Sequence, residues 1–80
     1  MRTVYEKNLP DAFLCVRDMR DEGIGFSANL RVYGRVVNLL DVSAAGVSPL
    51  RAMQKLMRDP AAIRWKRELE AEMPDILSAA

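Results

Sequence analysis

The most informative pattern in this chain of 80 residues is a strict alternation of apolar and polar side chains between Ile24 and Val32. The apolar members are Ile24, Phe26, Ala28, Leu30 and Val32. Because successive side chains of a β-strand point to opposite faces of a sheet, this period predicts a strand with one buried face. Tyr33-Gly34 then favours a tight reversal and Val36 to Val42 a returning strand, so we expect an antiparallel hairpin at about residues 24–42.

Two proline-containing segments after the hairpin have the composition of helix starts. Ser48-Pro49 offers a side-chain acceptor for free backbone N–H groups and a fixed φ that suits the first turn, which predicts a helix at about 49–58. Asp59-Pro60 repeats this arrangement and predicts a second helix at about 60–72, which Met73-Pro74 should end. Because a proline disfavours helical geometry at the preceding residue, the two helices should meet in a bend.

The N-terminal third has two interpretations. Thr3 to Tyr5 favour a short N-terminal edge strand. Asn8 to Asp11 then have the features of a helix start, which favours a helix at about 10–22 with Gly23 as its left-handed C-terminal residue. The alternative is a strand within residues 11–19, because the apolar run there is short and continuous. The helix is the favoured interpretation.

These elements together predict an α+β fold in a single domain, residues 1–80. Eighty residues suffice for one core, and a content of 50% hydrophobic and 29% charged residues is ordinary for a globular chain. The expected architecture is a small antiparallel sheet, made of the hairpin and the N-terminal edge strand. The helix at about 10–22 and the two C-terminal helices should pack on it.

The residue content argues against catalysis and metal binding. Histidine is absent, which removes the side chain most used for proton transfer near neutral pH and the commonest transition-metal ligand. Asp18, Asp21 and Glu22 would fall close together on the first helix, but Arg17 and Arg20 compensate their charge and no calcium-type loop accompanies them. We therefore expect no enzyme activity, no metal and no cofactor.

The cysteine content and the hydropathy pattern favour a cytoplasmic protein. Cys15 is the only cysteine, so we expect no internal disulfide and assign it the role of a small buried hydrophobe. The longest apolar run, Ala12 to Val16, is far shorter than the ~20 residues that span a bilayer. The N-terminus also lacks a basic segment followed by an apolar one. The sequence thus predicts a reducing compartment and no membrane contact.

Charge is segregated along the chain, although the formal net charge is only +1. Residues 49–67 contain one acid, Asp59, and six bases: Arg51, Lys55, Arg58, Arg64, Lys66 and Arg67. The charged residues of the C-terminal tail are all acids: Glu68, Glu70, Glu72 and Asp75. Segregated charge affects the choice of partner more than the fold. The six bases are therefore the predicted partner-binding residues, and the acidic tail is a second candidate surface.

The segment Gly46 to Leu56, GVSPLRAMQKL, resembles the turn and recognition helix of helix-turn-helix DNA-binding proteins. Such a motif needs a helix directly before the turn, whereas Arg35 to Val42 favour a strand. The helix of the segment also has an apolar stripe that should face a core: Leu50, Met53, Leu56 and Met57. An amphipathic core helix, with its bases left to solvent, is therefore favoured over base-specific DNA reading.

Two other features are compatible with nucleic-acid binding but have a simpler interpretation. Residues 35–72 offer the strand and two helices of a ribbon-helix-helix protein, but the ribbon should be polar outward, and residues 36–40 are apolar except for Asn38. Trp65 lies among bases, as at base-stacking sites. It shares helical spacing with Leu69 and Met73, however, which predicts a core position.

The function that these observations favour is a non-catalytic protein-protein interaction module. Its basic helical face would bind an acidic or nucleic-acid-binding surface of a larger cytosolic protein or nucleoprotein complex. Small inhibitors from phages and other mobile elements, anti-CRISPR proteins among them, work in this way, and the comparison rests on size, absent chemistry and segregated charge. The alternative is a small DNA-binding transcriptional regulator that uses Arg51, Lys55 and Arg58 on phosphates. An exposed sheet edge would also allow a homodimer.

Overall fold

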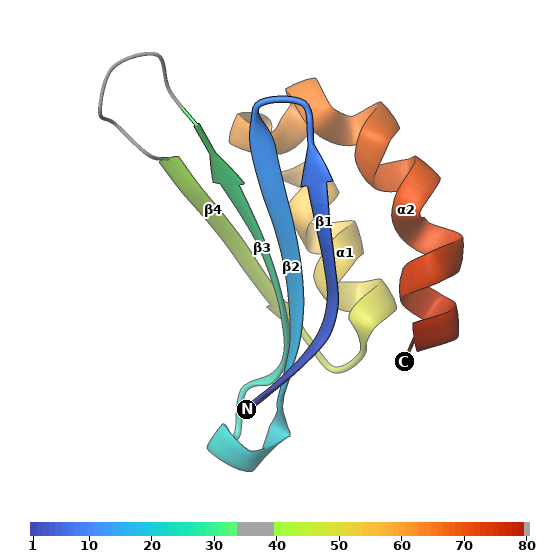
Figure 1. The fold of residues 1–80 in the computed structure, drawn as a ribbon. Helices are drawn as coiled ribbons and strands as arrows, with labels where there is room; N and C mark the ends of the chain where they lie inside the picture. The colour runs from blue at the N-terminus through green and yellow to red at the C-terminus, as the bar shows by residue number, and fades with distance from the viewer. Residues whose placement is uncertain (34–39, 80) are drawn as a thin grey trace.

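The computed structural model describes residues 1–33 and 40–79 as a four-stranded antiparallel sheet packed by helices. The strands follow one another in the order β1-β2-β3-β4 (Figure 1). They are β1 (Arg2–Leu9), β2 (Ala12–Met19), β3 (Gly25–Val32) and β4 (Leu40–Gly46). The helical elements are η1 (Arg20–Glu22), α1 (Pro49–Arg58), η2 (Pro60–Trp65) and α2 (Lys66–Ala79), where η denotes a 3₁₀ segment. The expected α+β class is confirmed.

The helix predicted at about 10–22 is wrong, because its residues form β2 and the 3₁₀ turn η1. Pro10 and Asp11 begin no helix; they are the two loop residues of a hairpin in which Leu9 pairs with Ala12. Asp11 has a φ of 59°, a left-handed value that aspartate tolerates better than most residues. The apolar run is continuous because both faces of β2 are shielded from solvent: Leu14 and Val16 are buried in the core, and on the other face Cys15 is buried and Phe13 half-buried.

The remaining strand predictions are confirmed with adjusted boundaries. The edge strand expected at Thr3 to Tyr5 extends over all of β1. The alternating segment forms β3, although Ile24 lies just before it and is 47% exposed. The returning strand was expected at Val36, and residues 34–39, with Gly34 of the reversal, lie outside the described residues. Its described part, β4, continues to Gly46.

Gly23, Ser48 and Asp59 have the local geometry that was predicted, but only Ser48 begins an α-helix. Gly23 has a φ of 74° and donates its N–H to Arg20 O at 3.1 Å, although it ends only η1. Ser48 Oγ accepts the Arg51 N–H at 3.2 Å at the start of α1. Asp59 Oδ1 accepts the Ala61 N–H at 2.9 Å at the start of η2, and Asp59 itself has extended backbone angles. The chain therefore bends between α1 and η2.

The second C-terminal helix differs from its prediction at both ends. Its first residues form the 3₁₀ segment η2, and α2 continues through Pro74 to Ala79 where Met73-Pro74 was expected to end it. A proline removes one backbone hydrogen bond from a helix. Ile76, which is fully buried, anchors the final turns against the core, and this contact keeps the chain helical beyond Pro74.

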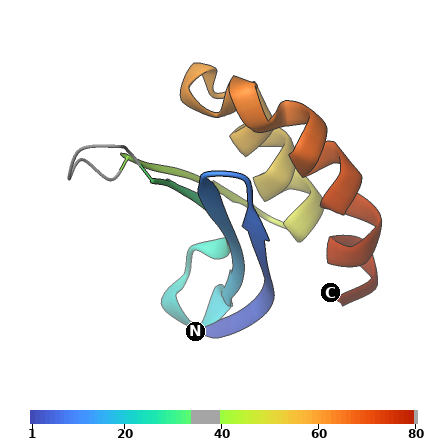
Figure 2. The same cartoon turned by 45° about the horizontal axis from the view of Figure 1, so that its top comes forward.

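The core lies between one face of the sheet and the helices (Figure 2). Helix α1 packs over β3 and β4, and α2 packs beside α1 and against β1. The largest fully buried side chains of this core are Leu14, Val16, Leu30, Met53, Leu56, Leu69 and Ile76. On the opposite sheet face Asn29 Nδ2 donates to Ser43 Oγ at 2.7 Å, and Arg31 pairs with Asp41 at 3.1 Å. Neither described helix is long and apolar enough to cross a bilayer.

Candidate functional site

Helix α1 holds three of the six predicted bases on its exposed side. Arg51, Lys55 and Arg58 are all exposed, and the ten residues of α1 include no acid. The helix keeps this orientation because its other side is buried, through Pro49, Ala52, Met53 and Leu56. The predicted core stripe is thus confirmed at Met53 and Leu56. It is wrong at Leu50, which is 38% exposed, because Ala52 lies nearer the centre of the buried side.

The other three bases flank Trp65 at the junction of η2 and α2. Trp65 is only 6% exposed, so the prediction of a core position is confirmed. Its Nε1 donates to the carbonyl oxygen of Pro10 at 2.9 Å, which attaches η2 to the loop between β1 and β2. The guanidinium carbon of Arg64 lies 5.2 Å from the Trp65 ring centroid, in cation–π geometry. Lys66 and Arg67 follow and are exposed.

The bend at Asp59 brings bases of α1 and α2 to one surface. Arg58 and Lys66 line a shallow hollow of about 200 Å³, together with Gln54, Met57 and Glu70. Lys66 also lines a second hollow of about 560 Å³, together with Ile63, Arg64, Arg67, Glu68 and Glu70. The two hollows share Lys66 and Glu70, so Arg58, Arg64, Lys66 and Arg67 form one continuous surface, which we call the helical basic surface.

Arg51 and Lys55 line neither hollow, and Arg51 lies near β4. A Cβ atom added to Gly46, the last residue of β4, would meet Arg51 Cβ at 2.8 Å, so Arg51 sits directly over the end of that strand. Lys55 follows Arg51 by four residues on the same side of α1. Four of the six predicted bases thus line the two hollows, whereas Arg51 and Lys55, on the same exposed side of α1 as Arg58, do not.

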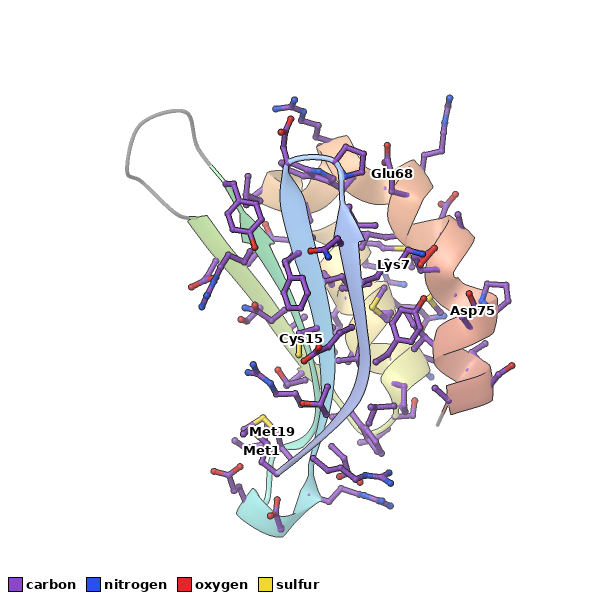
Figure 3. The ribbon with its side chains drawn as sticks, in the orientation of Figure 1. Met1, Lys7, Cys15, Met19, Glu68 and Asp75 are labelled. Carbon is purple, nitrogen blue, oxygen red and sulfur yellow. The ribbon has the colours of Figure 1, made fainter. Side chains whose placement is uncertain are left out.

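The acidic tail does not form a separate surface. Glu70 lines both hollows among the bases. Glu72 points inward, accepts the Tyr5 hydroxyl at 2.8 Å and lies 3.8 Å from Lys7, which reaches from β1 toward α2 (Figure 3). Glu68 has one buried carboxylate oxygen, Oε2, without a hydrogen-bond partner among residues 1–33 and 40–79. Glu70 thus lies among the bases and Glu72 lies beside Lys7, so the segregation of charge along the sequence is reduced in space.

Three side chains of β1 and β2 have perturbed pKa values, and in each case the cause lies within the fold. The hydrogen bond to Glu72 raises the pKa of Tyr5 to about 12. The hydrogen bonds from Arg20 lower the pKa of Asp18 to about 2. Burial raises the pKa of the Cys15 thiol. These three groups stand on β1 and β2, so none of them belongs to the helical basic surface.

The acidic cluster of the sequence is separated by the change from helix to strand. Asp18 lies near the end of β2 and is bound by Arg20, at 2.6 and 3.0 Å, whereas Asp21 and Glu22 lie in η1. Across the described part of the chain, no group of three histidine, cysteine, aspartate or glutamate side chains is placed to hold a metal ion.

One structural feature near the bases was not predicted from the sequence. Residues 43–45 lie beyond the hairpin expected at about 24–42, yet they continue β4 at the edge of the sheet. Their composition, Ser43, Ala44 and Ala45, gave little strand signal, because alanine is depleted in strands. Because β4 leads directly into α1, the first helix of a helix-turn-helix motif is missing, as the sequence predicted.

Comparisons with models of protein families, with curated protein sequences and with solved structures found no match.

Proposed function

We propose that the protein is a non-catalytic interaction module that binds an acidic or nucleic-acid-binding surface of a larger partner through its exposed bases. The observation that carries the proposal is the bend at Asp59, which gathers Arg58, Arg64, Lys66 and Arg67 around two connected hollows. Arginine is well suited to such a surface because its planar guanidinium pairs with a carboxylate through two parallel hydrogen bonds.

The details of this surface favour contact with a protein. Ile63 is 65% exposed and lies beside the bases in the larger hollow, so it offers apolar contact next to charge. Arginine and exposed apolar side chains are typical of the residues that dominate binding energy at interfaces. Glu70, in the midst of the bases, would favour a partner of mixed charge over a uniformly anionic polymer. By analogy with phage and mobile-element inhibitors such as anti-CRISPR proteins, the partner would be a larger cytosolic protein or nucleoprotein complex.

Charge reversal at the helical basic surface tests this function. The partner would first be identified by affinity capture and cross-linking mass spectrometry, and its binding would then be measured with purified proteins. The double variant R58E/R64E should weaken binding at least a hundredfold and leave the unfolding midpoint within a few degrees. The control is Arg2→Glu, an exposed base of β1, which should bind like the parent protein. Unchanged binding by R58E/R64E would exclude this surface as the contact site.

A second candidate function is a small DNA-binding regulator. The observation that favours it is α1, in which Arg51, Lys55 and Arg58 are exposed and no acid is present to repel phosphates. Affinity for duplex DNA should then fall steeply with salt, because each phosphate contact releases a counterion. Absence of binding to duplex DNA at low salt would exclude this function and leave the interaction module.

A further inference from the structure

The two edge strands of the sheet differ in what covers them. Among the residues that the structure describes, β4 pairs with β3 alone. The Tyr33 N–H donates to Asp11 O at 2.9 Å, and hydrogen-bonded pairs alternate with non-bonded pairs along antiparallel strands. Followed across β3, this alternation directs the backbone groups of Val42 and Ala44 toward β3. The N–H and C=O groups of Asp41, Ser43 and Ala45 therefore point outward along the free edge.

This free edge lacks the features that usually block strand addition. Edge strands are commonly protected by lysine, proline, a bulge or unpaired charge. Residues 40–46 contain no lysine and no proline, and their register with β3 is uninterrupted from Val32–Leu40 to Phe26–Gly46. The only charge, Asp41, is paired with Arg31. The edge of β4 that faces away from β3 is thus flat, and small side chains line it.

Positive charge lies beside the edge on the helical side of the sheet. Arg51 sits over Gly46 at the end of β4, and Lys55 follows one turn later on α1. Both side chains are exposed, and α1 contains no acid to neutralise them. A strand added along β4 would place every second side chain on this side of the sheet, in reach of these two bases.

We propose that the β4 edge binds an extended acidic segment of a partner protein as a fifth strand, with its acidic side chains directed toward Arg51 and Lys55. Backbone hydrogen bonds to Asp41, Ser43 and Ala45 supply affinity, and the two bases supply the preference for acids. This proposal rests on the proposed interaction function and names the kind of partner segment that Arg51 and Lys55 would recognise.

A second copy of the chain fits this edge less well than an acidic segment. Two β4 strands paired antiparallel across a two-fold axis would bring two α1 helices, each with exposed Arg51 and Lys55, to the same side of the extended sheet. Like charges in close contact oppose association, and α1 has no acid that could pair across the axis. An acidic strand meets the same bases with the opposite charge.

The test uses the full chain and a capped peptide, Thr-Glu-Val-Glu-Val-Glu-Thr, with Lys in place of each Glu in the control peptide. Binding is followed by NMR, through amide shifts and hydrogen exchange. The acidic peptide should shift the amides of Ser43 and Ala45 and slow their exchange at least tenfold. The control peptide should cause neither effect. Absence of these effects at millimolar acidic peptide would overturn the proposal.

Two variants separate what backbone hydrogen bonds contribute to peptide binding from what charge contributes. Ala45→Pro removes an outward N–H while leaving the bonds between β4 and β3, and it should weaken binding of the acidic peptide at least tenfold. R51E/K55E changes only exposed side chains of α1 and should weaken it by a similar factor. Arg2→Glu, an exposed base of β1 outside both hollows and α1, should leave it unchanged. Retained binding by both R51E/K55E and Ala45→Pro would place the peptide elsewhere.

Other outcomes distinguish this proposal from the function on which it rests. Loss of partner binding by R58E/R64E, with no peptide effect at Ser43 or Ala45, would leave the interaction module standing and remove the added strand. A dimer in sedimentation that Ala45→Pro converts to monomer would overturn the proposal in favour of a second copy.

Discussion

The β1 edge of the sheet carries charged side chains and lies beside α2, whereas the β4 edge carries small side chains and, among the described residues, β4 pairs with β3 alone. On β1, Tyr5 and Lys7 both contact Glu72 of α2, and a register shift interrupts the pairing between Thr3 and Tyr5. On β4 the register is regular and the outward residues are small or paired. The chain thus protects one edge with its own C-terminal helix and leaves the other able to pair.

The difference between the two edges depends most strongly on Trp65, because this side chain attaches the helical layer to the β1–β2 loop. Trp65→Ala should lower the free energy of unfolding by about 3–5 kcal/mol, because it leaves a large cavity and frees the Pro10 carbonyl. Denaturant titration followed by circular dichroism measures the change. The neighbouring exposed residue is the control: Ile63→Ala should change stability by less than about 0.5 kcal/mol. A loss below about 1 kcal/mol for Trp65→Ala would mean that η2 does not hold this end of the sheet.

The end of β4 depends on close contact between Gly46 and α1. Gly46→Ala should destabilise the fold by about 1–3 kcal/mol, because the new Cβ would lie 2.7 Å from the Ala52 nitrogen and 2.9 Å from the Arg51 carbonyl carbon. The control is Ala45→Thr, on the exposed neighbour, which should stay within about 0.5 kcal/mol of the parent. Equal stability of Gly46→Ala and the parent would show that α1 can move away from β4.

The contact between β1 and α2 should be visible in a tyrosine titration. Tyr5→Phe removes the hydrogen bond to Glu72 and should lower stability by about 1 kcal/mol. Because the folded pKa of about 12 lies above the ordinary value of 10.0, this contribution is present below pH 10 and is lost as the pH rises toward 12. Absorbance at alkaline pH measures the titration, and Glu72→Gln should bring the Tyr5 pKa down. A Tyr5 pKa unaffected by Glu72→Gln would contradict the contact.

The smallest expected effect concerns Asp18, which pairs with Arg2 of β1 in the sheet register. Arg20→Gln should raise the Asp18 pKa from about 2 toward 3.8, and Arg2→Gln should raise it less, since its guanidinium is 3.9 Å away. The lowered folded pKa stabilises the protein above about pH 4, and this contribution is lost as the pH falls toward 2. NMR titration of the side-chain carboxyl provides the measurement. A larger shift with Arg2→Gln would reverse the order of the two contacts.

The sequence predicted those parts of the fold that local chemistry determines. The alternation before Val32 specified β3, and the Ser48 and Asp59 caps specified where α1 and η2 begin, because both signals act within a few residues. The strand β2 was interpreted as a helix because Pro10 and Asp11 suit either a helix start or a hairpin loop. Only pairing with the distant β1 and β3 decides between the two. Pro74 lies inside α2 for a similar reason, since the burial of Ile76 is a tertiary contact.

The sequence predicted which residues belong to the candidate site, but it did not predict how they are arranged in space. The six bases are exposed as expected, but only Arg58, Arg64, Lys66 and Arg67 line the two hollows, and Arg51 instead lies over the end of β4. The inward turn of Glu72 was also hidden, because its partner Tyr5 is 67 residues away in the chain. The positions of these side chains in space depend on how α1 and α2 pack on the sheet.

The buried thiol of Cys15 makes the central strand accessible to a chemical measurement. It is 2% exposed, on an inner strand paired with both β1 and β3, and burial raises its pKa. Cys15 lies on the sheet face opposite Leu14 and Val16, outside the core that the helices cover. Alkylating reagents attack the thiolate, so modification requires that the side chains packed around Cys15 on that face move aside. In the folded protein the rate of alkylation therefore reports local opening of the helix-free face of the sheet, without any introduced label site.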